Sequence, residues 1–272
     1  MSEASLPLIQ FMLSDIDGTL LHPDHSLSQA NIDAVRKLQE AGIHFSVASS
    51  RPPRAMREQI AALGITLPTV AFNGANIINP DGSLLKAHRI APDAARTSLE
   101  VFAGERVAVW VFADDQWLLL DPQGDYVEHE RNTLGYDFVQ VDSFDAYIDR
   151  IDKIVAASKD FELLKRLEVK LNPLIAGSAL AARSQSYYLD VTALDANKGT
   201  ALETLAETLG VPLANTAAIG DAGNDVAMFL RAGLSIAMGQ AEVGVKTQAN
   251  YVTDSNADDG LAGAIERYIL PR

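Results

Sequence analysis

The chain has 272 residues, of which 48% are apolar and 21% are charged, and its formal net charge is −14 at pH 7. These values are typical of a globular protein with one large or two smaller domains. Such an acidic chain should repel nucleic acid and anionic membranes, so we expect neither as a partner. The sequence contains no cysteine, which excludes disulfide bonds and cysteine-based metal or nucleophile chemistry.

No apolar run approaches the roughly 18 residues that a membrane-spanning helix needs. Residues Met1 to Gln10 lack the basic stretch and apolar run of a signal peptide. The absence of cysteine also fits a reducing compartment. We therefore expect a cytoplasmic protein. A monomer or a weak homodimer is the expected assembly, although no sequence pattern determines it.

The first third of the chain alternates between strand and helix patterns, bounded by helix caps and glycines. The expected elements are a strand at Leu8–Ser14, a helix capped by Ser28 and ending near Gly42, a strand at Ile43–Ala48, a helix from Pro52 to about Leu63, and a strand at Thr69–Phe72. The last third repeats the alternation, with a helix at Lys198–Leu209, strands at Thr216–Ile219, Leu234–Met238 and Tyr251–Thr253, a helix at Asn224–Leu230 and a closing helix to about Ile269.

The middle of the chain has a different pattern, because it mixes strand-like runs, a hairpin turn near Asp114 and two helical stretches. We expect a separate α+β domain at residues 85–187, inserted into a core formed by residues 1–84 and 188–272. The alternation on both sides predicts that the core is α/β, with a doubly wound, Rossmann-like parallel sheet covered by helices on both faces.

Two acidic clusters follow predicted strands of the core. Asp15 and Asp17 follow the first strand, and Asp221 and Asp225 follow the strand at Thr216–Ile219. Ligands of open α/β sheets bind at the carboxyl ends of the strands, and carboxylates there favour Mg²⁺ together with substrate phosphate oxygens. A calcium loop is excluded for the first cluster, because its sixth and twelfth positions lack the required Gly and Glu. Asp225 alone could equally complement a helix dipole.

Further polar residues lie where predicted helices begin. Ser49, Ser50 and Arg51 follow the second strand, where hydroxyls and free amides favour an anion, although simple helix capping explains either serine equally well. Lys198 opens a helix, where the helix dipole disfavours positive charge. Asn224 is a candidate helix cap. These residues are candidate phosphate contacts, each with a plain structural alternative.

Taken together, these pieces resemble the haloacid dehalogenase superfamily of phosphohydrolases, and more narrowly its Cof-type sugar-phosphate phosphatases with a type IIB cap. The matching segments are Asp15-Ile16-Asp17-Gly18-Thr19, Ala48-Ser49-Ser50-Arg51, Asn197-Lys198-Gly199 and Gly220-Asp221-Ala222-Gly223-Asn224-Asp225. Phe72-Asn73-Gly74-Ala75 also resembles a segment common in that subfamily. Ser49 and Ser50 stand where the subfamily usually has Thr and Gly, which affects the geometry of that loop.

The resemblance implies a mechanism and a role for each residue. Asp15 would attack phosphorus to form an aspartyl-phosphate, and Asp17 would act as general acid and then general base. Mg²⁺ would be held by Asp15, the backbone carbonyl of Asp17 and Asp221, with Asp225 orienting the metal's waters or Lys198. The residues expected to bind the substrate are Ser49, Ser50, Arg51, Asn73, Lys198 and Asn224. Of these, Lys198 and Ser49 would also stabilise the transition state.

The expected substrate is a small phosphorylated metabolite, such as a sugar phosphate or a phosphorylated cofactor like FMN or PLP, chosen by the inserted cap. Two alternatives remain open at this point. A phosphomutase shares the aspartyl-phosphate but returns the phosphoryl group to the substrate. A phospho-accepting receiver domain has a similar set of acids, hydroxyl and lysine, but is much shorter and lacks an insert.

Overall fold

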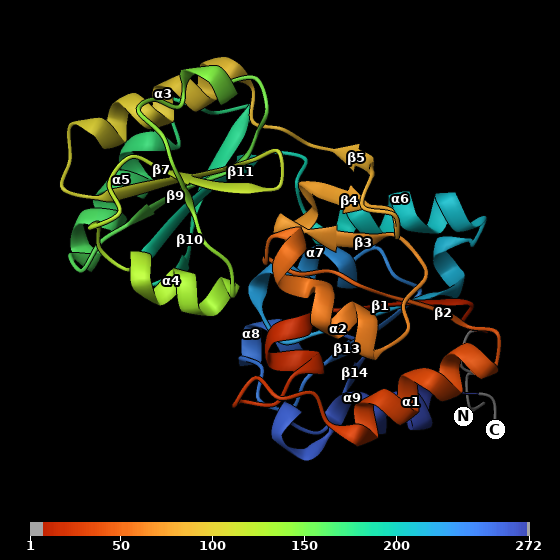
Figure 1. The fold of residues 1–272 in the computed structure, drawn as a ribbon. Coiled ribbons are helices and arrows are strands. Elements are labelled where there is room, and N and C mark those ends of the chain that lie inside the picture. The colour runs from red at the N-terminus through yellow and green to blue at the C-terminus, as the bar shows by residue number, and fades with distance from the viewer. Residues whose placement is uncertain (1–7, 271–272) are drawn as a thin grey trace. The chain divides into compact units, whose positions relative to one another are not determined.

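The structure, a computed structural model, describes residues 8–270 (Figure 1). The chain forms two compact units: the first lies within residues 1–50, 56–85 and 197–272, and the second comprises 51–55 and 86–196. The predicted lack of a signal peptide concerns mainly residues 1–7, which lie outside the described range. Among residues 8–270, no helix is long and apolar enough to cross a membrane.

The first unit is built on a parallel sheet with the strand order β14-β13-β12-β1-β2. Its strands are β1 (Phe11–Ser14), β2 (His44–Val47), β12 (Thr216–Gly220), β13 (Leu234–Ala237) and β14 (Tyr251–Val252). The interior strand β1, between β12 and β2, is buried along its whole length, as expected for a short apolar run in a parallel sheet. The predicted α/β architecture with a parallel central sheet is confirmed.

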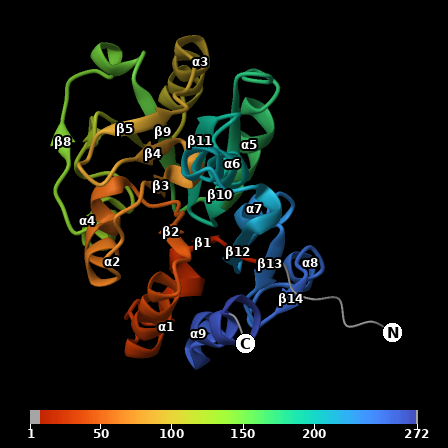
Figure 2. The ribbon, with the colours of Figure 1, turned by 90° about the vertical axis from the view of Figure 1, so that its right-hand side faces the viewer.

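Helices cover both faces of this sheet. They are α1 (Gln29–Glu40), α2 (Arg57–Ala62), α6 (Lys198–Leu209), α7 (Val226–Phe229), α8 (Val243–Lys246) and α9 (Gly260–Ala264). Figure 2 shows α1 and α9 together on one side of β1 and β12, and α6 and α7 on the other. Phe11 and Leu13 of β1 pack in one core cluster with Leu202 and Leu205 of α6, because alternate residues of a strand face the same side.

A small antiparallel extension adjoins the parallel sheet, and only its first strand was predicted. It contains β3 (Thr69–Ala71), β4 (Asn76–Ile78) and β5 (Leu84–Ala87), with β3 and β4 antiparallel. A parallel bridge between Ala48 and Val70 joins it to the end of β2. The strand expected at Thr69–Phe72 therefore ends one residue early, because Phe72 begins a tight turn into β4.

The second unit contains a mostly antiparallel sheet with the order β10-β11-β9-β6-β7-β8. Its strands are β6 (Ala108–Ala113), β7 (Gln116–Leu119), β8 (Val139–Gln140), β9 (Ile151–Ala157), β10 (Ala179–Gln185) and β11 (Tyr188–Ala193). Its helices are α3 (Pro92–Ala103), α4 (Val127–Leu134) and α5 (Phe161–Leu171). Residues from α3, α5 and one face of the sheet form the core of this unit.

The predicted boundaries of the insert need correction. We placed the return to the core at residue 188, but β11 pairs with both β9 and β10, so the second unit continues to Ala196. Residues 51–55, which we assigned to the core, also group with the second unit. Both errors arise because pairing and packing with distant segments decide these assignments, and a local pattern does not report such contacts.

Candidate functional site

The predicted site residues of the first unit follow strands that are neighbours in the sheet. Asp15 follows β1, Ser49 lies just beyond β2, and Asp221 follows β12. Since β1 lies between β12 and β2, and all three are parallel, their carboxyl ends meet at one edge. This is the edge at which open α/β sheets bind ligands.

A buried lysine links the first and last motifs. Nζ of Lys198 lies 2.5 Å from Oδ1 of Asp15 and 2.7 Å from Oδ1 of Asp225. The Lys198 side chain is completely buried, although it stands at the first position of α6. The two carboxylates therefore compensate for the unfavourable placement of a cation at a helix N-terminus.

Burial and the neighbouring charges change the pKa values of the groups in this cluster. Burial tends to lower the pKa of Lys198, but the carboxylates of Asp15 and Asp225 outweigh burial and hold this pKa above its usual value. Burial raises the pKa of Asp15, while Lys198 opposes the rise and Asp225 adds to it. Burial, followed by the charge of Asp225, raises the pKa of Asp221 to about 6. The cluster thus sets three carboxyl groups against one ammonium group, and the ionised forms of Asp15 and Asp221 are disfavoured.

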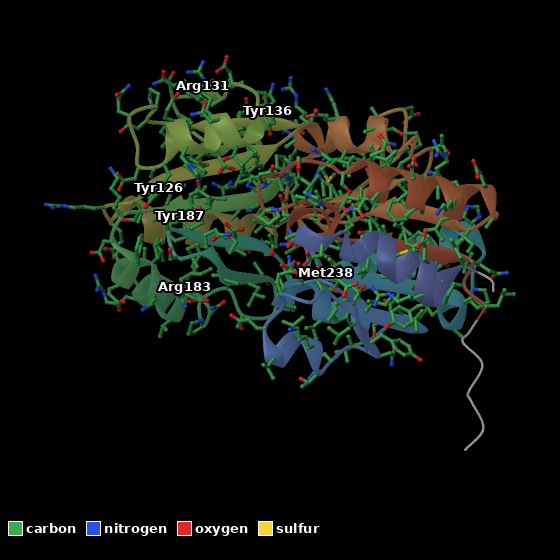
Figure 3. The ribbon with its side chains drawn as sticks, turned by 90° about the horizontal axis from the view of Figure 1, so that it is seen from below. Tyr126, Arg131, Tyr136, Arg183, Tyr187 and Met238 are labelled. Carbon is green, nitrogen blue, oxygen red and sulfur yellow. The ribbon has the colours of Figure 1, made fainter. Side chains whose placement is uncertain are left out.

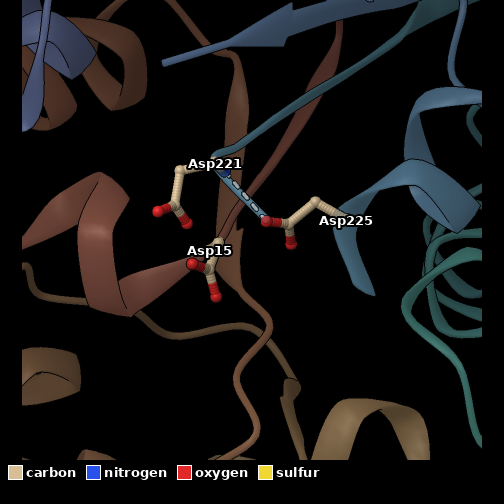
Figure 4. A group of neighbouring side chains, drawn as sticks. All are labelled: Asp15, Asp221 and Asp225. Atoms are coloured by element: carbon tan, nitrogen blue, oxygen red, sulfur yellow. Dashed lines mark hydrogen bonds between the residues drawn. The ribbon is translucent and has the colours of Figure 1, made fainter. Parts of the chain in front are cut away.

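Asp225 has both carboxylate oxygens occupied by donors. Its Oδ2 accepts the backbone N–H of Asp221 at 2.9 Å (Figure 4) and that of Ala222 at 3.0 Å, and its Oδ1 accepts a hydrogen bond from Nζ of Lys198. The side chain is fully buried. Asp225 therefore holds the loop that carries Asp221 and contacts the ammonium group of Lys198.

The loop after β1 closely approaches the loop after β12. Gly18 has φ +76°, and a Cβ atom at this position would overlap the carboxylate of Asp221. Glycine is thus required here both for the left-handed backbone and for the close approach. The first and fourth motifs, distant in sequence, are in contact.

One residue of the site was missed by the sequence analysis. Nε2 of Gln240 donates a hydrogen bond of 2.6 Å to the backbone carbonyl of Gly18, and the side chain also hydrogen-bonds Asp221. Its Oε1 accepts the backbone N–H of Asn256 at 3.0 Å. The available signal was its position in the loop after the predicted strand at Leu234–Met238.

The donor set of this cluster fits a hard divalent cation. One carboxylate oxygen of Asp15, one of Asp221 and one of Asp225 lie within 4.8 Å of one another. Carboxylate oxygens are the preferred protein ligands of Mg²⁺. Burial, and after it the charge of Asp225, raises the pKa of Asp15 and Asp221, so a cation bound beside them would favour their ionised forms. Both oxygens of Asp225 already accept hydrogen bonds, so Asp15 and Asp221 are the better candidates for direct ligands.

Asp17 lies in the same turn as Gly18, but its side chain is outside this carboxylate cluster. The side chain is 38% exposed, and its Oδ1 lies 3.5 Å from Nδ1 of His25. The structure therefore sets Asp17 apart from the cluster of Asp15, Asp221 and Asp225, and its role as general acid and base stays a prediction.

The other predicted substrate contacts divide between the two units. Ser49 is buried, and its backbone carbonyl accepts the N–H of Asn73 at 2.8 Å. Nδ2 of Asn224 in turn donates to Oδ1 of Asn73 at 2.9 Å, while Ser50 is half-buried in the first unit. Arg51 belongs to the second unit, where its Nη1 donates to the carbonyl of Ala55 at 3.3 Å.

The second unit carries a polar cluster that sequence patterns did not reveal. Nζ of Lys153 lies 2.6 Å from Oδ2 of Asp190, and both side chains are largely buried. The hydroxyl of Tyr188 donates to Oε2 of Glu130 at 3.0 Å, and burial raises the pKa of Glu130 against the opposing charge of Lys153. Lys153, Tyr188 and Asp190 lie on one sheet face, because their positions alternate along β9 and β11.

Aromatic rings adjoin this cluster. The rings of Tyr126 and Tyr187 stack with their centroids 4.6 Å apart (Figure 3), and Tyr188 meets both edge-on. Stacked and edge-on aromatic pairs are stabilising and offer a flat apolar surface. The cluster therefore combines charged and aromatic groups within a single unit.

Comparison with known proteins relates this chain to a family of enzymes. A family model described as haloacid dehalogenase-like hydrolase matches residues 12–265. The chain is 31% identical to an HMP-PP phosphatase of Cronobacter sakazakii over 84% of this chain and 83% of the relative. It is 27% identical to a 5-amino-6-(5-phospho-D-ribitylamino)uracil phosphatase of Bacillus subtilis over 96% of each chain. A solved haloacid dehalogenase-like hydrolase of Bacteroides thetaiotaomicron matches with a TM-score of 0.87 at 26% identity, covering 95% of this chain and 99% of that one.

Proposed function

Because the chain belongs to the haloacid dehalogenase-like hydrolase family, we propose that it is a Mg²⁺-dependent phosphatase that hydrolyses small phosphate monoesters through an aspartyl-phosphate. The observation that carries this proposal is the buried carboxylate of Asp15 at a strand end, in contact with Lys198 and grouped with Asp221 and Asp225. The names of the two phosphatase relatives support a small phosphorylated substrate.

In the first chemical step, an Oδ atom of Asp15 attacks phosphorus and the bond from phosphorus to the leaving oxygen breaks. Asp17 gives its proton to that oxygen, so the alcohol departs uncharged. In the second step Asp17 takes a proton from water, whose oxygen attacks phosphorus and releases the Asp15 carboxylate and inorganic phosphate. The half-exposed position of Asp17 supports its alternating use as acid and base.

Asp15, Asp221 and the backbone carbonyl of Asp17 would hold Mg²⁺, with Asp225 fixing the loop of Asp221. When bound, the ion neutralises charge on the carboxylates and the phosphoryl oxygens. Lys198 stabilises the negative charge of the transferring group, since its ammonium already contacts the nucleophile. Ser49 and Asn224 supply further hydrogen bonds to the phosphoryl oxygens, and Ser50 and Arg51 are weaker candidate contacts.

We further propose that the second unit selects the leaving group of the substrate. Its cluster of Lys153, Asp190 and Glu130 beside stacked tyrosines offers both hydrogen bonds and an apolar surface. Such a mixture is typical of sites that bind organic molecules. Candidate substrates include sugar phosphates and phosphorylated cofactors such as FMN or PLP.

A screen of phosphorylated metabolites, with Mg²⁺ and purified protein, tests this function. We expect release of inorganic phosphate from para-nitrophenyl phosphate and from a subset of metabolites, without an activating bisphosphate. A Glu130→Gln variant should change the ranking of metabolites by kcat/KM while keeping activity on para-nitrophenyl phosphate. Interconversion of isomeric sugar phosphates alone would instead indicate a phosphomutase, and a protein-bound phosphoryl group that persists for hours would indicate a receiver-like function.

Substitution of Asp221 by asparagine should raise the Mg²⁺ concentration for half-maximal activity by at least about tenfold, because an amide oxygen is a weaker ligand than a carboxylate. The measurement is phosphate release during a Mg²⁺ titration. Asp33→Asn, a half-exposed residue of α1 outside every motif, is the matched control and should behave like the unmodified protein. An unchanged titration for Asp221→Asn would remove Asp221 from the proposed ligands.

A further inference from the structure

The turn between β3 and β4 has an unusual backbone. Phe72, Asn73 and Gly74 have φ values of +50°, +57° and +111°, so three consecutive residues occupy the left-handed side. Two of them are not glycine, and such conformations persist only where surrounding contacts enforce them. Strained backbone of this kind clusters at functional sites, so the contacts of this turn are relevant to function.

This turn contacts three segments that carry site residues. The backbone N–H of Asn73 donates to the carbonyl of Ser49 at 2.8 Å. Gly74 lies against the backbone of Asn197, the residue before Lys198, so closely that a Cβ atom would overlap it. The side chain of Asn73 accepts a hydrogen bond from Nδ2 of Asn224 at 2.9 Å. The turn thus joins the second, third and fourth motifs.

The hydrogen bond between the two asparagines fixes which way one carboxamide points. The amide nitrogen of Asn224 has two N–H groups, and one of them is used by Oδ1 of Asn73. The other N–H remains available for an anionic oxygen. If the Asn224 carboxamide were rotated by half a turn, it would present its own carbonyl oxygen, which repels phosphate.

We propose that Asn73 is a positioning residue, which holds the carboxamide of Asn224 with its N–H toward the transferring phosphoryl group rather than binding the substrate itself. This inference rests on the proposed phosphatase function, in which Asn224 contacts the phosphoryl oxygens. Asparagine suits position 73 for two reasons. It tolerates the left-handed backbone better than most residues, and its side chain supplies the oxygen that accepts the hydrogen bond from Asn224.

The test replaces Asn73 by glycine, which keeps the left-handed backbone accessible and removes the side chain with its carboxamide. Inorganic phosphate serves as the probe, and its constant for competitive inhibition is measured in the presence of Mg²⁺, together with KM and kcat. We expect Asn73→Gly to weaken phosphate inhibition about tenfold, the size expected for one hydrogen bond to a charged group. KM should rise in parallel, and the melting temperature should change little.

Asn224→Ala and the double variant make the inference specific. Once Asn224 is alanine, removing the Asn73 side chain should have no further effect on phosphate inhibition, because its partner is gone. Additive effects would mean that Asn73 binds phosphate directly and would overturn the inference, as would an Asn73→Gly variant that loses only kcat or stability. Asp115→Gly, another left-handed residue in the β6–β7 turn of the second unit, controls for the backbone change and should leave phosphate inhibition unaltered.

The same measurements distinguish a wrong positioning role for Asn73 from a wrong phosphatase function. If Asn224→Ala leaves phosphate inhibition unchanged, Asn224 does not contact phosphate, and the positioning role falls even though phosphatase activity stands. If the unmodified protein neither releases phosphate from esters nor is inhibited by it, the proposed function itself is wrong.

Discussion

Substitution of Asp15 by asparagine is expected to abolish phosphate release, lowering kcat by roughly 10⁴-fold or more, as for other catalytic nucleophiles. A neutral amide neither attacks phosphorus effectively nor binds Mg²⁺ as a carboxylate does. The fold should persist, because Lys198 keeps its contact with Asp225. Since burial raises the pKa of Asp15, the ionised carboxylate is disfavoured in the folded protein, and the amide should leave the melting temperature equal or higher.

Asp15→Asn should therefore lose phosphatase activity without a fall in its melting temperature. Phosphate release and circular dichroism melting of the same preparation provide the measurement. Asp33→Asn makes the same chemical change on α1 and should alter neither quantity appreciably. Appreciable turnover by Asp15→Asn, beyond what contaminating enzyme explains, would contradict its role as nucleophile.

Substitution of Lys198 by methionine is expected to damage both catalysis and stability. The ammonium is completely buried between two carboxylates, so its loss leaves Asp15 and Asp225 without their shared cation. Removing one partner of a buried ionic network typically costs about 3–5 kcal/mol. We expect that loss in the free energy of unfolding, measured by urea denaturation, together with a fall in kcat of roughly 10²–10⁴-fold.

Lys170→Met offers a matched control for this substitution. Lys170 also pairs with a carboxylate, Glu105, at 3.2 Å, but its side chain is 53% exposed. Solvent screens such pairs, and their loss typically costs less than about 1 kcal/mol. If Lys198→Met and Lys170→Met lower the free energy of unfolding equally, the buried contacts of Lys198 do not stabilise the protein more than an exposed ion pair does.

The sequence was sufficient to predict the parallel core and the residues at its edge. Short apolar runs followed by polar clusters identify buried strands and their carboxyl ends, so Asp15, Ser49 and Asp221 could be placed together before any coordinates. The prediction of a haloacid dehalogenase-type hydrolase, which used four motifs spread over the chain, is confirmed by the family match at residues 12–265.

Elements defined by distant pairing could not be predicted in the same way. Strand β10 (Ala179–Gln185) contains Ala, Arg and Gln, which favour helices, yet it pairs with β11 along most of its length. The two-residue strand β8 depends on its parallel partner β7. These local sequences are ambiguous, and the sheet that receives them decides their conformation.

Within the site, the missed contacts share a physical cause. Gln240 and the orienting role of Asn73 act through hydrogen bonds to groups far away in the sequence, namely Gly18, Asp221 and Asn224. Neutral carboxamides occur in many exposed loops, so their residue type alone gives little signal. Charged clusters are easier to recognise, because burying them is costly unless they have a partner or a function.

The central claim is that Asp15 becomes phosphorylated during turnover, and trapping that species tests it most directly. The protein would be mixed with para-nitrophenyl phosphate and Mg²⁺, quenched with acid during turnover, digested and analysed by mass spectrometry, with borohydride reduction of a parallel sample. We expect one added phosphoryl group on the peptide containing Asp15, its conversion to homoserine at that position by borohydride, and no label in Asp15→Asn. Phosphate release without labelled protein, or a label on another residue, would contradict the account.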